Sequence, residues 1–284
     1  MLLRAFAKIN LDLRVAGRRA DGFHEIRTVL QSIDLHDDIE IEPAGRFEFE
    51  GPAGLDDSTN LVVRAVRLFE QEIASPVNVR IRLVKRIPVG AGLGGGSSDA
   101  ATTIVGLERL TGKRLTGQAL MRLLRALGSD VPFFAVGGRA VGVGRGDEIY
   151  PLEDDCSYAA VLVTPGFSIR TADAYSWLTV SDISPSIEGF CAQFAPGRGG
   201  GEPMNEFEGP VFARYPALGS IRAELLRRGA VRAALSGSGS VVYGVFPSTE
   251  AALEASGRMA ADFSAVVARP LGRADYFQRM VAAD

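Results

Sequence analysis

Residues 88–101 read PVGAGLGGGSSDAA, and this stretch decides the fold. Five of the seven residues from Gly90 to Gly96 are glycine, so side chains scarcely shield the backbone and its N–H groups can face a ligand. The preceding segment, 77–84, alternates apolar and polar residues like a half-buried strand, and the segment 98–111 has the pattern of a helix. Unpaired amides and the positive end of a helix dipole would converge at this loop, and phosphate is the usual occupant of such a site.

Several interpretations of this loop compete. A P-loop needs GxxxxGK[ST], and no lysine follows these glycines. The dinucleotide fingerprint GxGxxG matches at Gly90, Gly92 and Gly95, but it also needs a strand directly after the helix, and residues 116–128 predict a second helix instead. A third kind of ATP loop, PxxxGLGxSSxxA, fits residues 88–101 with one extra glycine. A plain surface loop is the alternative without function.

The composition narrows the class of protein. The chain has 284 residues, of which 46% are hydrophobic, and a net charge of −3, so a large core is expected and a nucleic-acid stripe is not. Charged side chains within residues 1–14 leave no apolar signal core, and no apolar run reaches the ~18 residues of a membrane span. Cys156 and Cys191 have no metal-like spacing. We therefore expect a cytoplasmic protein with reduced thiols and with no nucleic-acid or membrane partner.

Lysine is scarce in this chain. Only three of the 31 basic residues are lysine, namely Lys8, Lys85 and Lys113. In a chain that otherwise uses arginine, a lysine indicates a position where the compact ammonium group is needed.

The periodicities predict an α+β protein of two lobes, with an N-terminal domain at 1–150 and a C-terminal domain at 151–284. The expected strands are 5–15, 26–35, 39–42, 46–50, 77–84, 139–143, 147–152, 159–163, 241–246 and 265–268. The expected helices are 60–72, 98–111, 117–127, 216–228 and 249–261. Residues 181–203 are rich in loop-forming residues.

Six motifs occur in a fixed order: AKINLDL at 7–13, GRRADGFHEI at 17–26, the loop at 88–101, SDVPFF at 129–134, GRGDEI at 144–149 and ALSGSGSVVYGVF at 234–246. Together they resemble the superfamily of galactokinase, homoserine kinase, mevalonate kinase and phosphomevalonate kinase (the GHMP kinases). Within this superfamily, the combination of AKIN and DGFH resembles the motifs of the kinases of the non-mevalonate isoprenoid precursor pathway. Those kinases phosphorylate a cytidine diphosphate-linked methylerythritol. The resemblance is weakest between about 176 and 203.

This resemblance implies a two-lobed fold with ATP and a small-molecule substrate bound between the lobes, and Mg²⁺ with the ATP. The implied reaction is ATP-dependent phosphorylation of the 2-hydroxyl of the cytidylyl substrate. The implied ATP-binding residues are Pro88, Val89, Gly90, Ala91, Gly92, Leu93, Gly94, Gly95, Gly96, Ser97 and Ser98. The hydroxyls of Ser97 and Ser98 also suit caps at the helix start.

The resemblance assigns catalysis to Lys8 and Asp130. Alternation along residues 5–15 places Lys8 and Asn10 on the same face of one strand. By analogy Asp130 is the base, and Lys8 sits between it and the substrate hydroxyl, keeping the carboxylate ionised and offsetting developing negative charge. From the residues alone, Lys8 could equally be a solvated strand residue and Asp130 a turn residue.

The resemblance also implies the substrate-binding residues Asn10, Phe23, His24, Tyr175, Gly237, Ser238 and Gly239. His24 would read the cytosine edge, Phe23 would stack on the ring where the family more often has tyrosine, and Tyr175 would close the other face. Ordinary packing is the alternative for both aromatic residues, and His36 lies in a charged stretch and is expected to be structural.

No protein carboxylate is assigned to Mg²⁺, because Glu108 lies about three turns along its helix from Ser97, and the ion would be held mostly by ATP and water. The remaining alternatives are a superfamily kinase for another acceptor such as homoserine or mevalonate, a nucleotide-binding regulator without catalysis, and a dinucleotide oxidoreductase.

Overall fold

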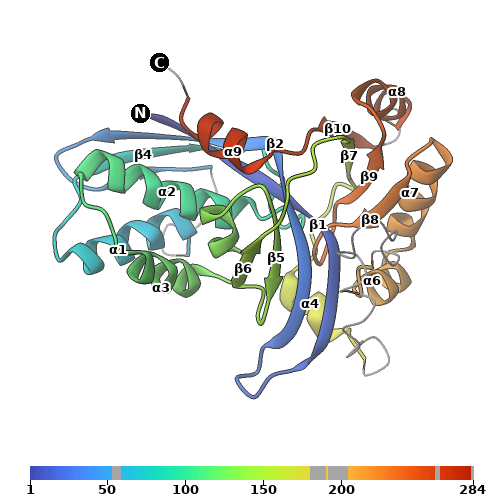
Figure 1. The fold of residues 1–284 in the computed structure, drawn as a ribbon, viewed down its shortest axis with the longest axis horizontal. Helices are drawn as coiled ribbons and strands as arrows, with labels where there is room; N and C mark the ends of the chain where they lie inside the picture. Colours follow the sequence, from blue (N-terminus) through green and yellow to red (C-terminus); the bar gives the residue numbers. More distant parts are fainter. Residues whose placement is uncertain (53–58, 180–189, 191–203, 260–262, 283–284) are drawn as a thin grey trace.

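Two β-sheets form the frame of the protein in the computed structural model, which describes residues 1–52, 59–179, 190, 204–259 and 263–282 (Figure 1). The strands of the first sheet are β1 (Leu2–Arg18), β2 (His24–Pro43), β3 (Glu48–Glu50), β4 (Val79–Val84), β5 (Arg139–Val143) and β6 (Glu148–Pro151). Their order is β3-β4-β2-β5-β6, β1 pairs with β2, and every pair is antiparallel except β3 with β4.

The second sheet is antiparallel and smaller. It has the order β10-β7-β9-β8 and consists of β7 (Ala159–Thr164), β8 (Arg232–Leu235), β9 (Val242–Phe246) and β10 (Ser264–Ala268). The helices are α1 (Leu61–Ile73), α2 (Gly95–Thr111), α3 (Gly117–Leu127), the 3₁₀ helix η1 (Val131–Ala135), α4 (Thr171–Ser176), α6 (Glu208–Arg214), α7 (Pro216–Arg227), α8 (Thr249–Met259) and α9 (Arg273–Met280). The predicted α+β class is confirmed.

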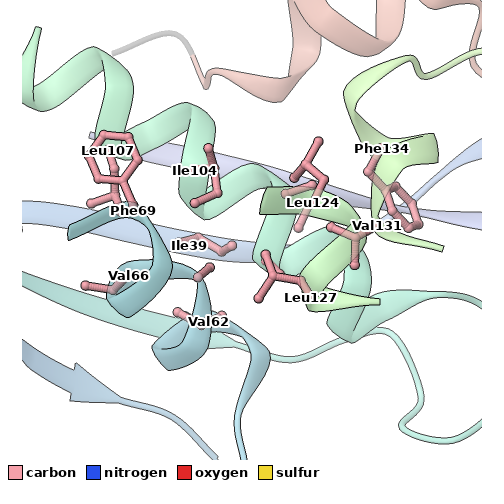
Figure 2. Close-up of a cluster of buried hydrophobic side chains, with 14 of the residues drawn as sticks. Ile39, Val62, Val66, Phe69, Ile104, Leu107, Leu124, Leu127, Val131 and Phe134 are labelled. Carbon is pink, nitrogen blue, oxygen red and sulfur yellow. The ribbon is translucent and has the colours of Figure 1, made fainter. Parts of the chain in front are cut away.

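The core of the first lobe lies between the first sheet and helices α1, α2 and α3. Figure 2 shows Val66 and Phe69 of α1 beside Leu107 of α2, with Leu124 and Leu127 of α3 at the other end of the cluster. Each of these apolar side chains is buried, and full burial stabilises by about 1.5–3 kcal/mol a residue. This core fixes α2, whose first turn forms one wall of the site described below.

Strand β1 lies where the two sheets meet. Ala7 and Ile9 pack in one buried cluster with Ala160 of β7 and Tyr243 of β9. The hydroxyl of Tyr243 donates a hydrogen bond to the carbonyl of Asn10 over 2.8 Å. The strand that carries Lys8 and Asn10 is therefore held from both lobes.

Two differences from the sequence-based expectations have clear causes. Strand β2 runs without a break through 36–38, because its pairing with β1 continues there, so the predicted separation into two strands is wrong. His36 lies in this strand, where its imidazole contacts the ring of Phe6 with centroids 5.4 Å apart. Helix α2 begins at Gly95 with Gly94 as its N-cap, so Ser97 and Ser98 are not caps.

Other elements carry too few periodic residues to be predicted, including the six-residue α4 and the seven-residue α6. Helix α9 returns to the first lobe, where Tyr276 donates to the carbonyl of Phe134 over 2.9 Å (Figure 1). The predicted boundary after residue 150 falls within β6, one residue before this strand ends, and the division into two domains stays a prediction. The expectation for 181–203 lies outside the described residues, apart from Phe190. In the part of the chain that the structure describes, no helix is both long and apolar enough to cross a membrane.

Candidate active site

A cavity of about 880 Å³ is bounded by β1, the glycine loop, the start of α2, the start of η1 and the second lobe. Its lining includes these residues that the sequence predicted: Lys8, Asn10, Phe23, His24, Pro88, Val89, Gly90, Ala91, Gly92, Leu93, Gly94, Gly95, Gly96, Ser97, Asp130, Tyr175, Gly237 and Ser238. Segments more than 200 residues apart in sequence thus meet around one space.

Lys8, Asn10 and Asp130 come together on the cavity wall. The Nζ of Lys8 lies 2.6 Å from Oδ1 of Asn10 and 3.4 Å from Oδ2 of Asp130. The lysine side chain is 4% exposed and the aspartate side chain 43% exposed, so the pair joins a buried ammonium to a carboxylate that faces the open space. Asn10 is oriented in turn by Thr28, whose hydroxyl accepts from its amide over 2.8 Å.

Asp130 stands at the N-cap position of η1, where a turn aspartate usually bonds to the backbone. Its side chain makes no such cap hydrogen bond. The geometry therefore favours the ion pair with Lys8 over the turn interpretation.

The carbonyl groups of the glycine loop already accept hydrogen bonds from other parts of the protein. The carbonyls of Gly90, Ala91, Gly92 and Leu93 accept hydrogen bonds from Ile169 N, Val241 N, Ser236 Oγ and Lys8 N respectively. The first N–H groups of α2 have no partner within the helix, so they are available to an anion in the cavity.

Gly94 must be a glycine for two reasons. Its φ is +71°, and a Cβ there would lie 2.8 Å from Phe134 and 3.1 Å from the side chain of Lys8. The loop therefore lies directly on the catalytic lysine that the resemblance implied.

The third glycine motif reaches the same point from the second lobe. A Cβ at Gly237 would lie 3.3 Å from Oδ1 of Asn10 and 3.4 Å from Nζ of Lys8. The amide of Asn205 donates to the carbonyl of Gly237 over 2.8 Å and so fixes this turn. Three motifs that are distant in sequence thus surround one ammonium group.

Aromatic residues also line the cavity. The ring of His24 stacks on Tyr175 with centroids 4.7 Å apart and an interplanar angle of 24°. Phe23 is exposed, and the guanidinium of Arg145 lies 4.7 Å from the centre of its ring. Burial, with the nearby charge of Arg18, lowers the pKa of His24, so this imidazole is neutral near pH 7. A neutral imidazole offers one donor and one acceptor, which is what reading a base edge requires.

Two predicted residues lie off this wall. The hydroxyl of Ser98 donates to the carbonyl of Phe6 over 2.7 Å and is fully buried, so it ties α2 to β1. Gly239 faces the side chains of Leu235 and Ile169. For both, a direct ligand contact stays a prediction that this geometry does not favour.

Sequence reasoning missed several lining residues, among them Thr59, Asn60, Lys85, Asp99, Arg145 and Thr171. Lys85 carried a signal, the scarcity of lysine, and Asp99 lies inside the glycine motif. Arg145 lies inside the GRGDEI motif at 144–149, and Thr59, Asn60 and Thr171 carried no distinguishing pattern.

The described residues contain no group of three or more His, Cys, Asp or Glu side chains that could hold a metal ion. Glu108, the nearest candidate by sequence, accepts a hydrogen bond from the backbone of Leu115 over 2.7 Å and caps that turn. That Mg²⁺ is held mostly by ATP and water oxygens stays a prediction.

Family models match the chain in two places, as the GHMP kinases N terminal domain at residues 60–138 and the GHMP kinases C terminal region at 197–265. A crystal structure of mevalonate kinase from Methanococcus jannaschii has a TM-score of 0.69 at 16% identity over 96% of this chain and 98% of its own, which shows the same fold. The fold and the cavity thus define a GHMP kinase.

More specific relatives narrow the class. The 4-diphosphocytidyl-2-C-methyl-D-erythritol kinase of Solibacter usitatus is 45% identical over 86% of this chain and 80% of its own length. That of Geobacter sp. is 38% identical over 89% of this chain and 92% of its own. A crystal structure of 4-(cytidine 5'-diphospho)-2C-methyl-D-erythritol kinase has a TM-score of 0.83 at 36% identity over 96% of this chain and 100% of its own. The chain belongs to the 4-diphosphocytidyl-2-C-methyl-D-erythritol kinase family.

Proposed function

We propose that the protein transfers the γ-phosphoryl group of ATP to the 2-hydroxyl of 4-diphosphocytidyl-2-C-methyl-D-erythritol, a step in making isoprenoid precursors. Membership of the kinase family supports the reaction. One observation carries the site assignment: the buried ammonium of Lys8 lies near both the glycine loop and Asp130, in a cavity that His24 and Phe23 also line.

The residues divide the work by position. The glycine loop and the start of α2 bind the phosphates through backbone N–H groups. Lys8 neutralises charge on the transferred group, and Asp130 accepts the proton of the hydroxyl. The acceptor oxygen forms a bond to the γ-phosphorus, the bond from that phosphorus to the β–γ bridging oxygen breaks, and ADP leaves with a phosphate monoester as the second product.

The residues proposed to bind the cytosine determine the specificity for the acceptor. His24 pairs with the cytosine edge, Phe23 stacks on one face of the ring, and Tyr175, whose own ring stacks on His24, closes the other face. Asn10, held by Thr28, orients the polyol beside Lys8. An acceptor without a nucleobase, such as homoserine or mevalonate, would leave these groups unused.

Mg²⁺ is proposed to enter with ATP, to neutralise charge on the β- and γ-phosphates, and to be held by phosphate and water oxygens. We also propose that the reaction takes place in the cytoplasm.

An acceptor panel tests this function. Purified protein is given ATP and Mg²⁺ with 4-diphosphocytidyl-2-C-methyl-D-erythritol, homoserine or mevalonate, and ADP release is followed with a coupled assay. We expect turnover with the cytidylyl acceptor and background rates with the others. Clear turnover with homoserine or mevalonate, and none with the cytidylyl acceptor, would reject the assignment.

Two variants distinguish the proposed kinase from a regulator that binds nucleotide without catalysis. Lys8→Ala and Asp130→Ala should each lower kcat by about 10²–10⁴-fold while the protein still binds ATP. Lys113→Ala, at an exposed lysine, is the matched control and should leave both properties unchanged. A wild-type protein that binds ATP but turns over none of the acceptors would support the regulator.

A further inference from the structure

The lysine at position 85 has no part in the chemistry described above. Its Nζ lies 2.5 Å from Oδ2 of Asp37 and 2.7 Å from Oδ2 of Asp99. The lysine side chain is 12% exposed, and the two aspartates are 0% and 3% exposed. One ammonium therefore joins two buried carboxylates on different elements, β2 and α2.

The second oxygen of Asp37 extends this cluster to the backbone. Its Oδ1 accepts hydrogen bonds from the amides of Arg86 and Ile87, over 2.5 Å and 2.8 Å. These two residues lead from β4 into the glycine loop, and Asp99 lies in the first turns of α2, where the loop ends. The cluster therefore holds both ends of the loop 88–94.

We propose that Lys85 is a positioning residue for ATP binding. Through Asp37 it holds the segment that leads into the glycine loop, and through Asp99 it holds the helix that begins where the loop ends. We call this cluster of Lys85, Asp37 and Asp99 the staple. The proposal deepens the proposed function, because the stapled loop is the part of the site assigned to phosphate. Without the staple, the two ends would be free to separate and the N–H groups would no longer point to one place.

The lysine cannot be exchanged for arginine here. A Cβ at Gly95 would lie 3.0 Å from Nζ of Lys85 and 2.9 Å from Ile87, so the loop entry and the first turn of α2 are already in close contact. A planar guanidinium is larger than an ammonium and would push these two segments apart. This explains a lysine at position 85 in a chain with three lysines among 31 basic residues.

The charges of the cluster are consistent with a structural staple. Burial lowers the pKa of Lys85, but Asp99 and Asp37 outweigh this effect and leave it raised, so the ammonium keeps its proton. Burial raises the pKa of Asp99 to about 8 despite the opposing effect of Lys85. The Oδ2 of Asp99 accepts a hydrogen bond from Lys85 Nζ over 2.7 Å in either protonation state of this carboxyl group.

Hydrogen–deuterium exchange on the nucleotide-free protein tests the staple without using activity. Lys85→Met and Asp99→Ala should each raise the exchange rates of amides 86–97 by about tenfold or more, and leave those of α3 and of the second sheet unchanged. Asp99→Asn keeps an acceptor oxygen for Lys85 and should stay within about twofold of the wild type. Lys85→Arg should behave like Lys85→Met. Wild-type exchange at 86–97 in Lys85→Met, or faster exchange spread over the whole lobe, would overturn the proposal.

Kinetics separate a staple from a direct contact with the nucleotide. Lys85→Met and Asp99→Ala should raise the KM for ATP about tenfold and leave the KM for the acceptor unchanged, and the double variant should be no worse than Lys85→Met alone. Effects that multiply in the double variant would show that Lys85 acts on the nucleotide itself and would overturn the staple. If Lys85→Met does not fold, Asp99→Ala and Asp99→Asn decide by the same exchange criterion. Because exchange needs no substrate, a wrong acceptor assignment would not affect this test.

Discussion

Replacing Lys8 by methionine removes the ammonium, with its charge and its hydrogen bond to Asn10, and keeps most of the side-chain volume. Methionine has a similar length and is apolar, and the site of Lys8 is already 3% exposed, so the side chain can keep its path beneath Gly94. The variant therefore isolates the contribution of the ammonium to phosphoryl transfer.

The distance between Lys8 Nζ and Asp130 Oδ2 gives the scale of the charge interaction that the substitution removes. Two unit charges 3.4 Å apart interact by about 5 kcal/mol at an effective dielectric constant of about 20. Asp130 is 43% exposed, so water compensates part of this energy in the ground state. We expect kcat to fall by about 10²–10⁴-fold, which corresponds to about 3–5.5 kcal/mol of transition-state stabilisation.

The measurement is steady-state ADP release with the cytidylyl acceptor, together with nucleotide binding by calorimetry and thermal unfolding. Binding of ATP should weaken far less than kcat falls, and the unfolding temperature should stay close to that of the wild type. Lys113→Met controls for a generic loss of positive charge. A kcat for Lys8→Met within threefold of the wild type would refute the role given to this ammonium.

Further predictions follow from single contacts. Gly92→Ala would place a Cβ 2.0 Å from the carbonyl oxygen of Ser236, so we expect at least a tenfold rise in the KM for ATP and a lower unfolding temperature. Gly112→Ala is the control, because Gly112 has a similar positive φ but a Cβ there would meet no atom within 4 Å. This variant should lower the unfolding temperature without changing the KM for ATP. Phe23→Ala should raise the KM for the cytidylyl acceptor by about 5–150-fold and leave the KM for ATP unchanged, because stacking on a base contributes about 1–3 kcal/mol. An unchanged KM for the cytidylyl acceptor would show that Phe23 does not stack on the base. Because the pKa of Asp99 rises from about 3.8 to about 8 on folding, the native state binds more protons at this site between these values, so the contribution of Asp99 to the free energy of unfolding should fall as pH rises from about 4 to 8. Urea denaturation at pH 5, 7 and 8 should show that the free energy of unfolding of Asp99→Asn increases relative to that of the wild type as pH rises, and the same pH dependence in both proteins would contradict the raised pKa.

The periodic elements of this fold could be predicted from the sequence. The helix 117–127 and the strand 139–143 have the bounds that their apolar spacing indicated, because each buries one face against the core. The start of α2 was placed too late, because a helix that begins inside a glycine run has no side-chain pattern to mark it. The continuity of β2 could not be predicted either, since its pairing with β1 carries the strand through a charged stretch that reads locally as a turn.

The site could be predicted only in part, for a related reason. The order of the motifs predicted that Lys8, Asp130 and the glycine loop belong to one site, but the distances between them depend on how β1 packs between the two sheets. The cluster around Lys85 joins residues 48 and 14 positions away in the chain, and no periodicity relates these positions. A scarce residue type in an arginine-rich chain was the one sign of its use.

A crystal structure with a non-hydrolysable ATP analogue and 4-diphosphocytidyl-2-C-methyl-D-erythritol would examine the catalytic arrangement most directly. We predict the terminal phosphate within hydrogen-bond distance of Lys8 Nζ and of the amides that open α2, with the 2-hydroxyl beside Asp130 and the cytosine against Phe23 and His24. Phosphates bound away from the glycine loop, or an acceptor hydroxyl out of reach of Asp130, would contradict it.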